Sequence, residues 1–158
     1  MTTGLLRREL YESSVGLGPR PASVPTLLLT SWRVPVVLLL IKACRQEKAK
    51  REQLVVLNWS LRDPATHEAV GEWLVENPLK EPLAVRYEPA LVRATNIAHG
   101  LGLLHEVAGW LELTKQGSEL LSEIEELDAY ASERQLLEEL PKPLSHSAAK
   151  ALLGGGVG

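Results

Sequence analysis

The stretch that decides the fold is residues 91–121, LVRATNIAHGLGLLHEVAGWLELTKQGSELL. Its first part is expected to form a helix, with Arg93 and Asn96 pointing outward. The apolar residues that recur there at helical spacing are Leu91, Ala94, Ala98 and Leu101. Gly100 and Gly102 interrupt this spacing, which is typical of the place where a helix ends.

The remainder of the stretch predicts two short strands and a second helix. The strands are expected at residues 103–106 and 110–113, joined by a tight turn in which Gly109 takes a positive backbone angle. Thr114 occupies the position of a helix N-cap. A helix, a hairpin and a helix in this order resemble the back half of a winged helix. The expected fold is therefore mainly α, a winged helix-turn-helix with a small β wing, to which a weak strand at residues 83–85 would add a third strand.

The composition fits one globular domain with a real core. The chain has 158 residues, a net charge of −3, no phenylalanine and one cysteine, Cys44. The negative charge argues against a surface that binds polyanions all round. A single cysteine excludes an internal disulfide framework and a cysteine-based zinc site, and it fits a reducing cytoplasm.

Three segments are expected along the chain. Residues 1–23 form an arm that is mobile or ordered by a partner, residues 24–140 form the winged-helix domain, and residues 141–158 form a flexible tail. The uninterrupted apolar run at residues 34–41 is far shorter than the ~20 residues that a membrane-spanning helix needs. We therefore expect a buried helix there and no membrane contact.

Two helices are candidates for a partner interface. The helix at residues 36–41 is apolar on every side, so the rest of the domain or another chain must cover it. A long acidic helix is expected at residues 119–140, with an apolar stripe that either closes its own domain or packs on a partner helix. The candidate interface residues are Val36, Val37, Leu39, Leu40, Leu120, Ile124 and Leu127.

Directly after the apolar helix at residues 36–41, the chain becomes basic. The cations concentrated there are Lys42, Arg45, Lys48, Lys50 and Arg51. They are either a solvated helix end or a contact for phosphates or an acidic partner. Two further helices are predicted, at residues 52–61 and, after an Asp63 cap and a first-turn Pro64, at residues 65–76.

No arrangement of residues indicates catalysis. The histidines lack a metal-ligand spacing, and no glycine-rich loop has the surroundings of a phosphate or dinucleotide site. Cys44 is expected to be a core residue, although its basic neighbours offer the alternative of a lowered thiol pKa. We therefore expect no catalytic residue, metal, cofactor or small-molecule substrate, and the protein is predicted not to be an enzyme.

One hypothesis is a DNA-binding transcriptional regulator. In a winged helix-turn-helix, the helix before the wing enters the major groove, and here its outward residues are Arg93, Asn96 and His99, with Arg86 nearby. Phosphate contacts supply most of the affinity for DNA, however, and the chain has few cations for them. The tip of the wing has no lysine or arginine, and the following helix is acidic. These features argue against site-specific binding by this chain alone.

The other hypothesis is an assembly role, and it depends on a resemblance. A leucine-rich helix, a Trp-Leu helix that ends near a proline, an arginine-bearing link and a winged-helix tail resemble the middle component of bacterial three-component ABC-ATPase antiphage systems, which are close to the Lamassu-like group. The matching positions are Trp73, Leu74, Pro78, Arg86, Arg93 and residues 101–121. The resemblance implies an accessory subunit that docks onto a coiled-coil, SMC-like ATPase and contacts nucleic acid through the complex, if at all.

Overall fold

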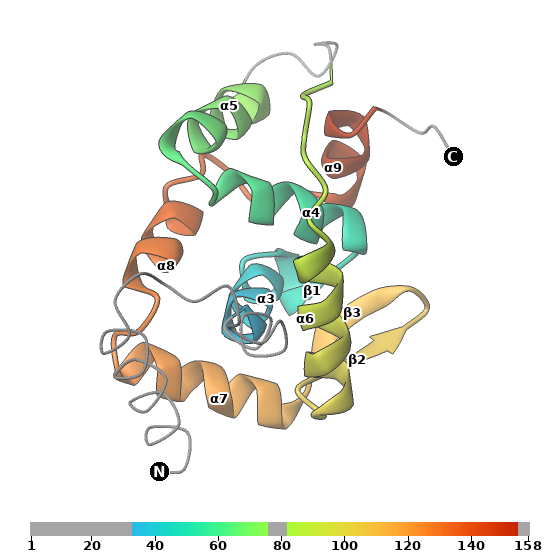
Figure 1. Cartoon of the computed structure of the whole chain (residues 1–158), viewed down its shortest axis with the longest axis vertical. Helices are drawn as coiled ribbons and strands as arrows, with labels where there is room; N and C mark the ends of the chain where they lie inside the picture. Colours follow the sequence, from blue (N-terminus) through green and yellow to red (C-terminus); the bar gives the residue numbers. More distant parts are fainter. Residues whose placement is uncertain (1–32, 76–81, 155–158) are drawn as a thin grey trace, which may run out of the picture.

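The computed structural model describes residues 33–75 and 82–154, which form a mainly helical fold with one small sheet (Figure 1). The predicted arm at residues 1–23 lies outside these described residues. The elements in chain order are α3 (Val34–Lys42), the 3-10 turn η1 (Arg45–Glu47), β1 (Lys48–Ala49), α4 (Arg51–Ser60), α5 (Pro64–Val75), α6 (Pro89–Gly100), β2 (Leu104–Val107), β3 (Trp110–Leu113), α7 (Lys115–Glu126), α8 (Ala131–Glu138) and α9 (His146–Leu152).

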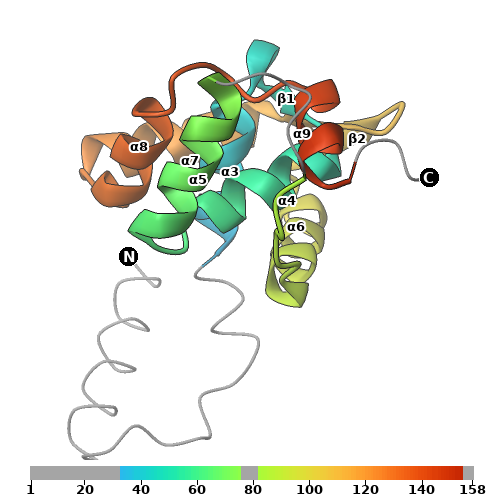
Figure 2. The same ribbon diagram turned by 90° about the horizontal axis from the view of Figure 1, so that it is seen from above.

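Helix α3 is the centre of the fold, and the other helices surround it (Figures 1 and 2). It begins at Val34 with Pro35 in its first turn, where the missing backbone N–H of a proline would have no partner within the helix. Arg33 connects this start to α4 and to the residue that precedes α6. Its Nη2 lies 3.1 Å from Glu88 Oε2, and its Nη1 donates to Asn58 Oδ1 at 3.3 Å.

The chain itself covers the apolar helix α3. Val37, Leu39 and Leu40 are buried in the core, and Val36 is half-buried against it. A fully buried side chain of this size contributes roughly 1.5–3 kcal/mol to folding, so the apolar run is explained by the stability of the domain. The interface predicted on α3 is therefore wrong. None of the helices in the described ranges is long and apolar enough to cross a membrane.

The small sheet is antiparallel with the strand order β1-β3-β2. Its third strand is β1, in which Ala49 is fully buried and pairs with Leu111, and it is not the segment predicted at residues 83–85. That segment is extended but binds elsewhere, because the Leu83 N–H donates to the Leu152 carbonyl at 3.1 Å. The weak alternation of its side chains therefore reflects packing beside α9.

The predicted hairpin is confirmed, with boundaries shifted by one residue in β2. Residue 107 pairs with residue 110, so Ala108 and Gly109 form a two-residue turn. Both have positive φ, 52° and 83°, which is the backbone pattern of the tight turns that suit the twist of a hairpin.

The predicted helix starts are also confirmed. The Thr66 N–H donates to Asp63 Oδ1 at 2.9 Å at the start of α5. The Gly117 N–H donates to Thr114 Oγ1 at 3.1 Å at the start of α7. In both places, the side chain satisfies a backbone donor that has no partner within the helix. The buried side chains of α5 are Val70, Trp73 and Leu74.

The long acidic helix predicted at residues 119–140 is instead two helices, α7 and α8. The chain leaves α7 through Asp128, which has a φ of 53°. The Asp128 N–H donates to the Glu125 carbonyl, and the Ala129 N–H donates to the Ile124 carbonyl, both at 3.0 Å. These two bonds form the Schellman termination of a helix, here with aspartate in the position that usually holds glycine.

The break changes where the predicted stripe lies. Ile124 is buried and Leu120 is half-buried against the core, so both belong to the domain itself. Leu127 follows the last residue of α7 and is 79% exposed. Of the seven apolar residues predicted for a partner interface, Leu127 is therefore the one that remains on the surface.

The segment predicted as a flexible tail at residues 141–158 contains helix α9, which packs against α4 (Figure 1). Its buried side chains are Leu144, Ala149 and Leu152. The N-cap of α9 is Ser145, whose Oγ accepts from the Ala148 N–H at 3.1 Å. Up to residue 154 the segment thus belongs to the folded domain, and residues 155–158 lie outside the described structure.

Candidate nucleic-acid interface

The predicted contact residues of α6 face outward. Arg93, Asn96 and His99 are exposed, as is Arg86 in the extended segment before the helix. Leu101, predicted to lie inward, is 62% exposed, because the helix ends one residue before it and the chain turns away. Helix α6 therefore presents a polar and basic surface without a carboxylate of its own.

Two of the five clustered cations are neutralised within the fold. Lys42 at the end of α3 pairs with Glu125 of α7, and Arg51 Nη2 lies 2.7 Å from Glu106 Oε1 of β2. Both pairs are exposed, and such pairs contribute between nothing and about 1 kcal/mol. They join elements that are distant in the sequence, and each of these cations has a carboxylate beside it that competes with a phosphate.

Lys48 and Lys50 are placed differently, on either side of the inward-pointing Ala49. Their Nζ atoms lie 5.2 and 5.0 Å from the centre of the Trp110 ring. Lys50 Nζ also donates to the Ala108 carbonyl at 3.2 Å, which brings a cation to the turn of the hairpin. The turn of the hairpin has no lysine or arginine of its own, so this cation comes from the residue that follows β1.

The register of the sheet explains why these side chains share one face. Lys48 lies opposite Glu112, which lies opposite His105 on the next strand, while Ala49 lies opposite Leu111 on the buried face. Side chains alternate between the two faces of a strand. The outer face therefore carries a row of Lys48, Glu112 and His105, followed by Trp110.

The carboxylates near this face are already bonded. Glu112 Oε1 lies 3.2 Å from His105 Nε2, and Glu52 Oε1 of α4 lies 3.2 Å from His146 Nε2 of α9. The His146 ring meets Trp110 edge-on, with ring centres 5.8 Å apart and an angle of 68°. Trp110 is thus held by an imidazole and flanked by two ammonium groups.

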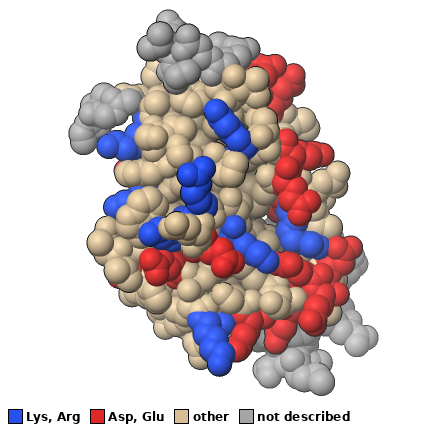
Figure 3. All heavy atoms as spheres, turned by 180° about the vertical axis from the view of Figure 1, so that it is seen from behind, with Lys and Arg blue, Asp and Glu red and all other residues tan. Residues whose placement is uncertain are grey.

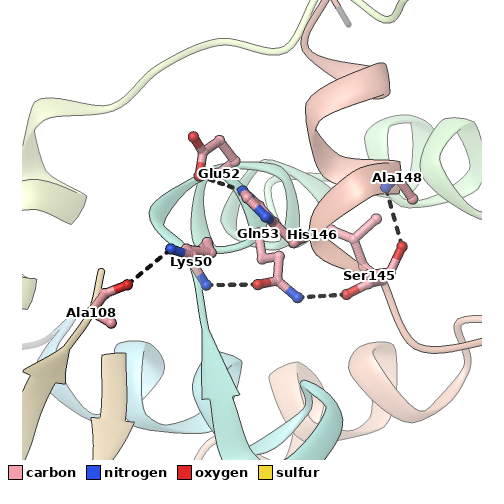
Figure 4. Close-up of polar contacts among 8 residues, drawn as sticks. Lys50, Glu52, Gln53, Ala108, Ser145, His146 and Ala148 are labelled. Carbon is pink, nitrogen blue, oxygen red and sulfur yellow. Dashed lines mark hydrogen bonds and ion pairs between the residues drawn. The ribbon is translucent and has the colours of Figure 1, made fainter. Parts of the chain in front are cut away.

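A buried glutamine fixes the backbone beneath this face (Figure 4). The Lys50 N–H donates to Gln53 Oε1 at 2.6 Å, and Gln53 Nε2 donates to the Leu144 carbonyl at 2.9 Å. Gln53 is 3% exposed, and a buried amide of this kind is costly unless its hydrogen bonds are made. The side chain therefore links the N-cap of α4 to the segment before α9.

The predicted contact residues do not form one surface. Figure 2 shows α6 and β1 on opposite sides of the described structure, so the outward residues of α6 lie apart from Lys48 and Lys50. Seen from behind in Figure 3, Asp and Glu gather along the edge where α7 and α8 lie, whereas Lys and Arg are spread over the middle of the face. Arg45, in η1, is exposed beside β1.

Sequence reasoning missed Trp110, His146 and Glu52 as parts of this face. Alternation along β1 would have placed Lys48 and Lys50 on the same side, but a strand of two residues gives no periodic signal. His146 comes from α9, in a segment predicted to be flexible, so nothing near it in the sequence indicated its contact with Trp110.

Cys44 is a core residue, as expected. It is 3% exposed, its Sγ–H donates to the Leu40 carbonyl at 3.4 Å, and burial raises the thiol pKa to about 12. The alternative of a pKa lowered by neighbouring cations is therefore wrong. Among the described residues, no group of three or more His, Cys, Asp or Glu side chains is placed to hold a metal ion.

The raised pKa of Cys44 predicts very slow alkylation of the folded protein. At pH 8, a thiol with a pKa of about 12 is ionised in about one molecule in ten thousand, and burial also blocks the reagent. Iodoacetamide labelling followed by mass spectrometry should be slow in buffer and rapid in urea. Rapid labelling of the folded chain would contradict this environment for the cysteine.

Comparison with known proteins identifies no family: no protein-family model, curated protein or solved structure matches this chain.

Proposed function

We propose that this protein is a non-catalytic accessory subunit with a winged-helix fold that docks onto a partner protein. The order of elements supports the fold proposal. A helix and a short strand precede the helices α4, α5 and α6, the hairpin β2-β3 follows, and β3 lies between β1 and β2. This is the arrangement expected when a helix is followed directly by a two-stranded wing.

The acidic surface of α7 and α8 carries the docking proposal (Figure 3). Its exposed carboxylates belong to Glu119, Glu123, Glu126, Asp128, Glu138 and Glu139. Leu127 is 79% exposed at the corner between the two helices, within this acidic surface. An apolar side chain surrounded by polar ones matches the apolar centre and polar rim of a protein interface, and the carboxylates repel a nucleic-acid backbone.

The class of partner protein is inferred from the resemblance to the middle component of three-component antiphage systems. We infer a coiled-coil, SMC-like or ABC ATPase that is present with this chain in a cytoplasmic bacterial defence complex. Of the matching positions, Trp73 and Leu74 are buried and so have a role in the core. Arg86 and Arg93 are exposed, and Pro78 lies outside the described residues.

Co-purification tests the docking proposal. Tagged protein expressed with the ATPase encoded by a neighbouring gene should retain that ATPase, and retention should weaken as salt is raised. The variant E123K/E126K, on the acidic surface, should lose most of the ATPase. The variant E68K/E72K makes the same charge change on exposed positions of α5 and should retain it. Equal retention by both variants, or no retention by the wild type, would contradict the proposal.

The second candidate function is a duplex-DNA-binding regulator, and α6 favours it. Arg93, Asn96 and His99 project from one helix, and arginine and asparagine match the edges of guanine and adenine. A regulator purified alone should shift duplex DNA with a salt slope of roughly −0.9 per phosphate contact. The variant R93A should then weaken binding to the preferred sequence more than binding to random sequence.

A further inference from the structure

We propose that the outer face of the sheet, centred on Trp110 and flanked by Lys48 and Lys50, binds a single strand of nucleic acid. The docking function does not require this site, since the acidic surface belongs to α7 and α8, whereas this face belongs to the sheet (Figure 1). A strand bound here has its phosphates on the lysine ammonium groups and a base on the indole ring.

The charge of this face is available to a phosphate. Among the described residues, neither Lys48 nor Lys50 forms an ion pair; their partners are the uncharged indole ring and the Ala108 carbonyl. The carboxylates of Glu52, Glu106 and Glu112 are each bonded to a histidine or an arginine instead. Lys48 and Lys50 therefore differ from Lys42 and Arg51 of the same cluster, whose charges carboxylates neutralise.

The aromatic ring is held in place for stacking. Trp110 belongs to the residue pair that closes the hairpin, and the His146 ring packs against it edge-on. The two lysine side chains over the ring are flexible, and an exposed contact between an ammonium and an indole is weaker than stacking of a base on the same ring. A base can therefore displace an ammonium group, which then remains close to the adjacent phosphate.

This chemistry selects unpaired bases. The faces of bases in a duplex are covered by their neighbours, so an aromatic side chain on a sheet stacks only on bases that are single-stranded. The outward residues of α6, which suit the edges of paired bases, lie on the opposite side of the described structure from β1 (Figure 2). A single strand of nucleic acid bound on the sheet is therefore recognised without the outward residues of α6.

Fluorescence anisotropy tests the preference for single strands. The full chain is titrated, at low salt, into labelled oligothymidine and oligouridine of about 15 nucleotides and into a duplex of the same length. Both single strands should bind, because stacking and phosphate contacts do not require a 2′-hydroxyl, and the duplex should bind more weakly. No binding of either single strand, or tighter binding of the duplex, would overturn the proposal.

Two substitutions of Trp110 separate stacking from packing. Leucine keeps an apolar side chain against the sheet but has no aromatic face, whereas phenylalanine keeps both. W110L should lose about 5- to 150-fold in affinity, which is the range for loss of one stacked base, and W110F should lose much less. Equal affinities for W110L and the wild type would overturn the proposal.

The lysines have a matched control. K48Q/K50Q should weaken binding and reduce the magnitude of the single-strand salt slope by about 1.4, from two contacts at about 0.7 each. K115Q/K142Q removes two charges from exposed lysines elsewhere and should leave the slope unchanged. Equal losses in both variants would overturn the site. Thermal melts show whether each variant is folded. If W110L is unfolded, the comparison of K48Q/K50Q with K115Q/K142Q tests the proposal instead.

Discussion

Replacing Gly117 with alanine is expected to destabilise the protein by about 3 kcal/mol, the upper range for an overpacked site. A Cβ at this position in the first turn of α7 would lie 2.0 Å from the Leu103 carbonyl oxygen and 3.0 Å from its carbon. That carbonyl cannot simply move away, because it accepts from the Thr114 N–H at 3.0 Å. Helix α7 must therefore shift as a whole, and it would lose packing against the core.

Gly100 supplies the control for this substitution. It lies in the last turn of α6, and an added Cβ would meet no atom within 4 Å. Because alanine has the higher helix propensity, G100A should raise the free energy of unfolding by about 0.5–1 kcal/mol. Urea denaturation of both variants measures the difference. A midpoint for G117A equal to that of the wild type would mean that α7 does not approach the Leu103 backbone this closely.

The parts of the fold that could be predicted from sequence are those with local signals. Asp63 followed by Pro64, and Thr114 three residues before Gly117, indicate helix starts through side-chain chemistry within one turn. The hairpin has a glycine at a turn position between two apolar segments. In each case the residues that determine the structure are neighbours, so no knowledge of the tertiary fold is needed.

The parts that could not be predicted depend on contacts between distant residues. Strand β1 has two residues, and it is a strand because Ala49 pairs with Leu111 across the sheet. The end of α7 has neither glycine nor proline, and it depends on Asp128 in a left-handed conformation that few sequences would indicate. The apolar spacing continues past residue 127, so spacing alone does not show that the helix ends there.

The candidate site shows the same division. The sequence identified a basic cluster but could not distinguish its members, because their partners are Glu125, Glu106 and Trp110, on other elements. Two cations are neutralised by these carboxylates, and two rest on an indole ring with their charge unpaired. A prediction of nucleic-acid contact therefore has to be made for each lysine or arginine separately.

Replacing Leu152 with alanine is expected to cost about 2–5 kcal/mol, the range for a large apolar side chain removed from a core. Leu152 is fully buried in the last turn of α9, and its carbonyl accepts from the Leu83 N–H, which fixes the extended segment before α6. A cavity there would loosen the contact of α9 with α4. The free energy of unfolding, measured with urea, should fall accordingly.

The adjacent Leu153 is a matched control, since it is 37% exposed and lies just beyond α9. L153A should change the free energy of unfolding by no more than about 0.5 kcal/mol. Hydrogen exchange distinguishes a shared core from a separate tail. If α9 is part of the core, L152A should lower amide protection in α4 as well as in α9. The contrary result would be a loss of protection confined to residues 146–152, with unchanged global stability. That result would mean that α9 unfolds independently and contributes nothing to the stability of the rest of the domain.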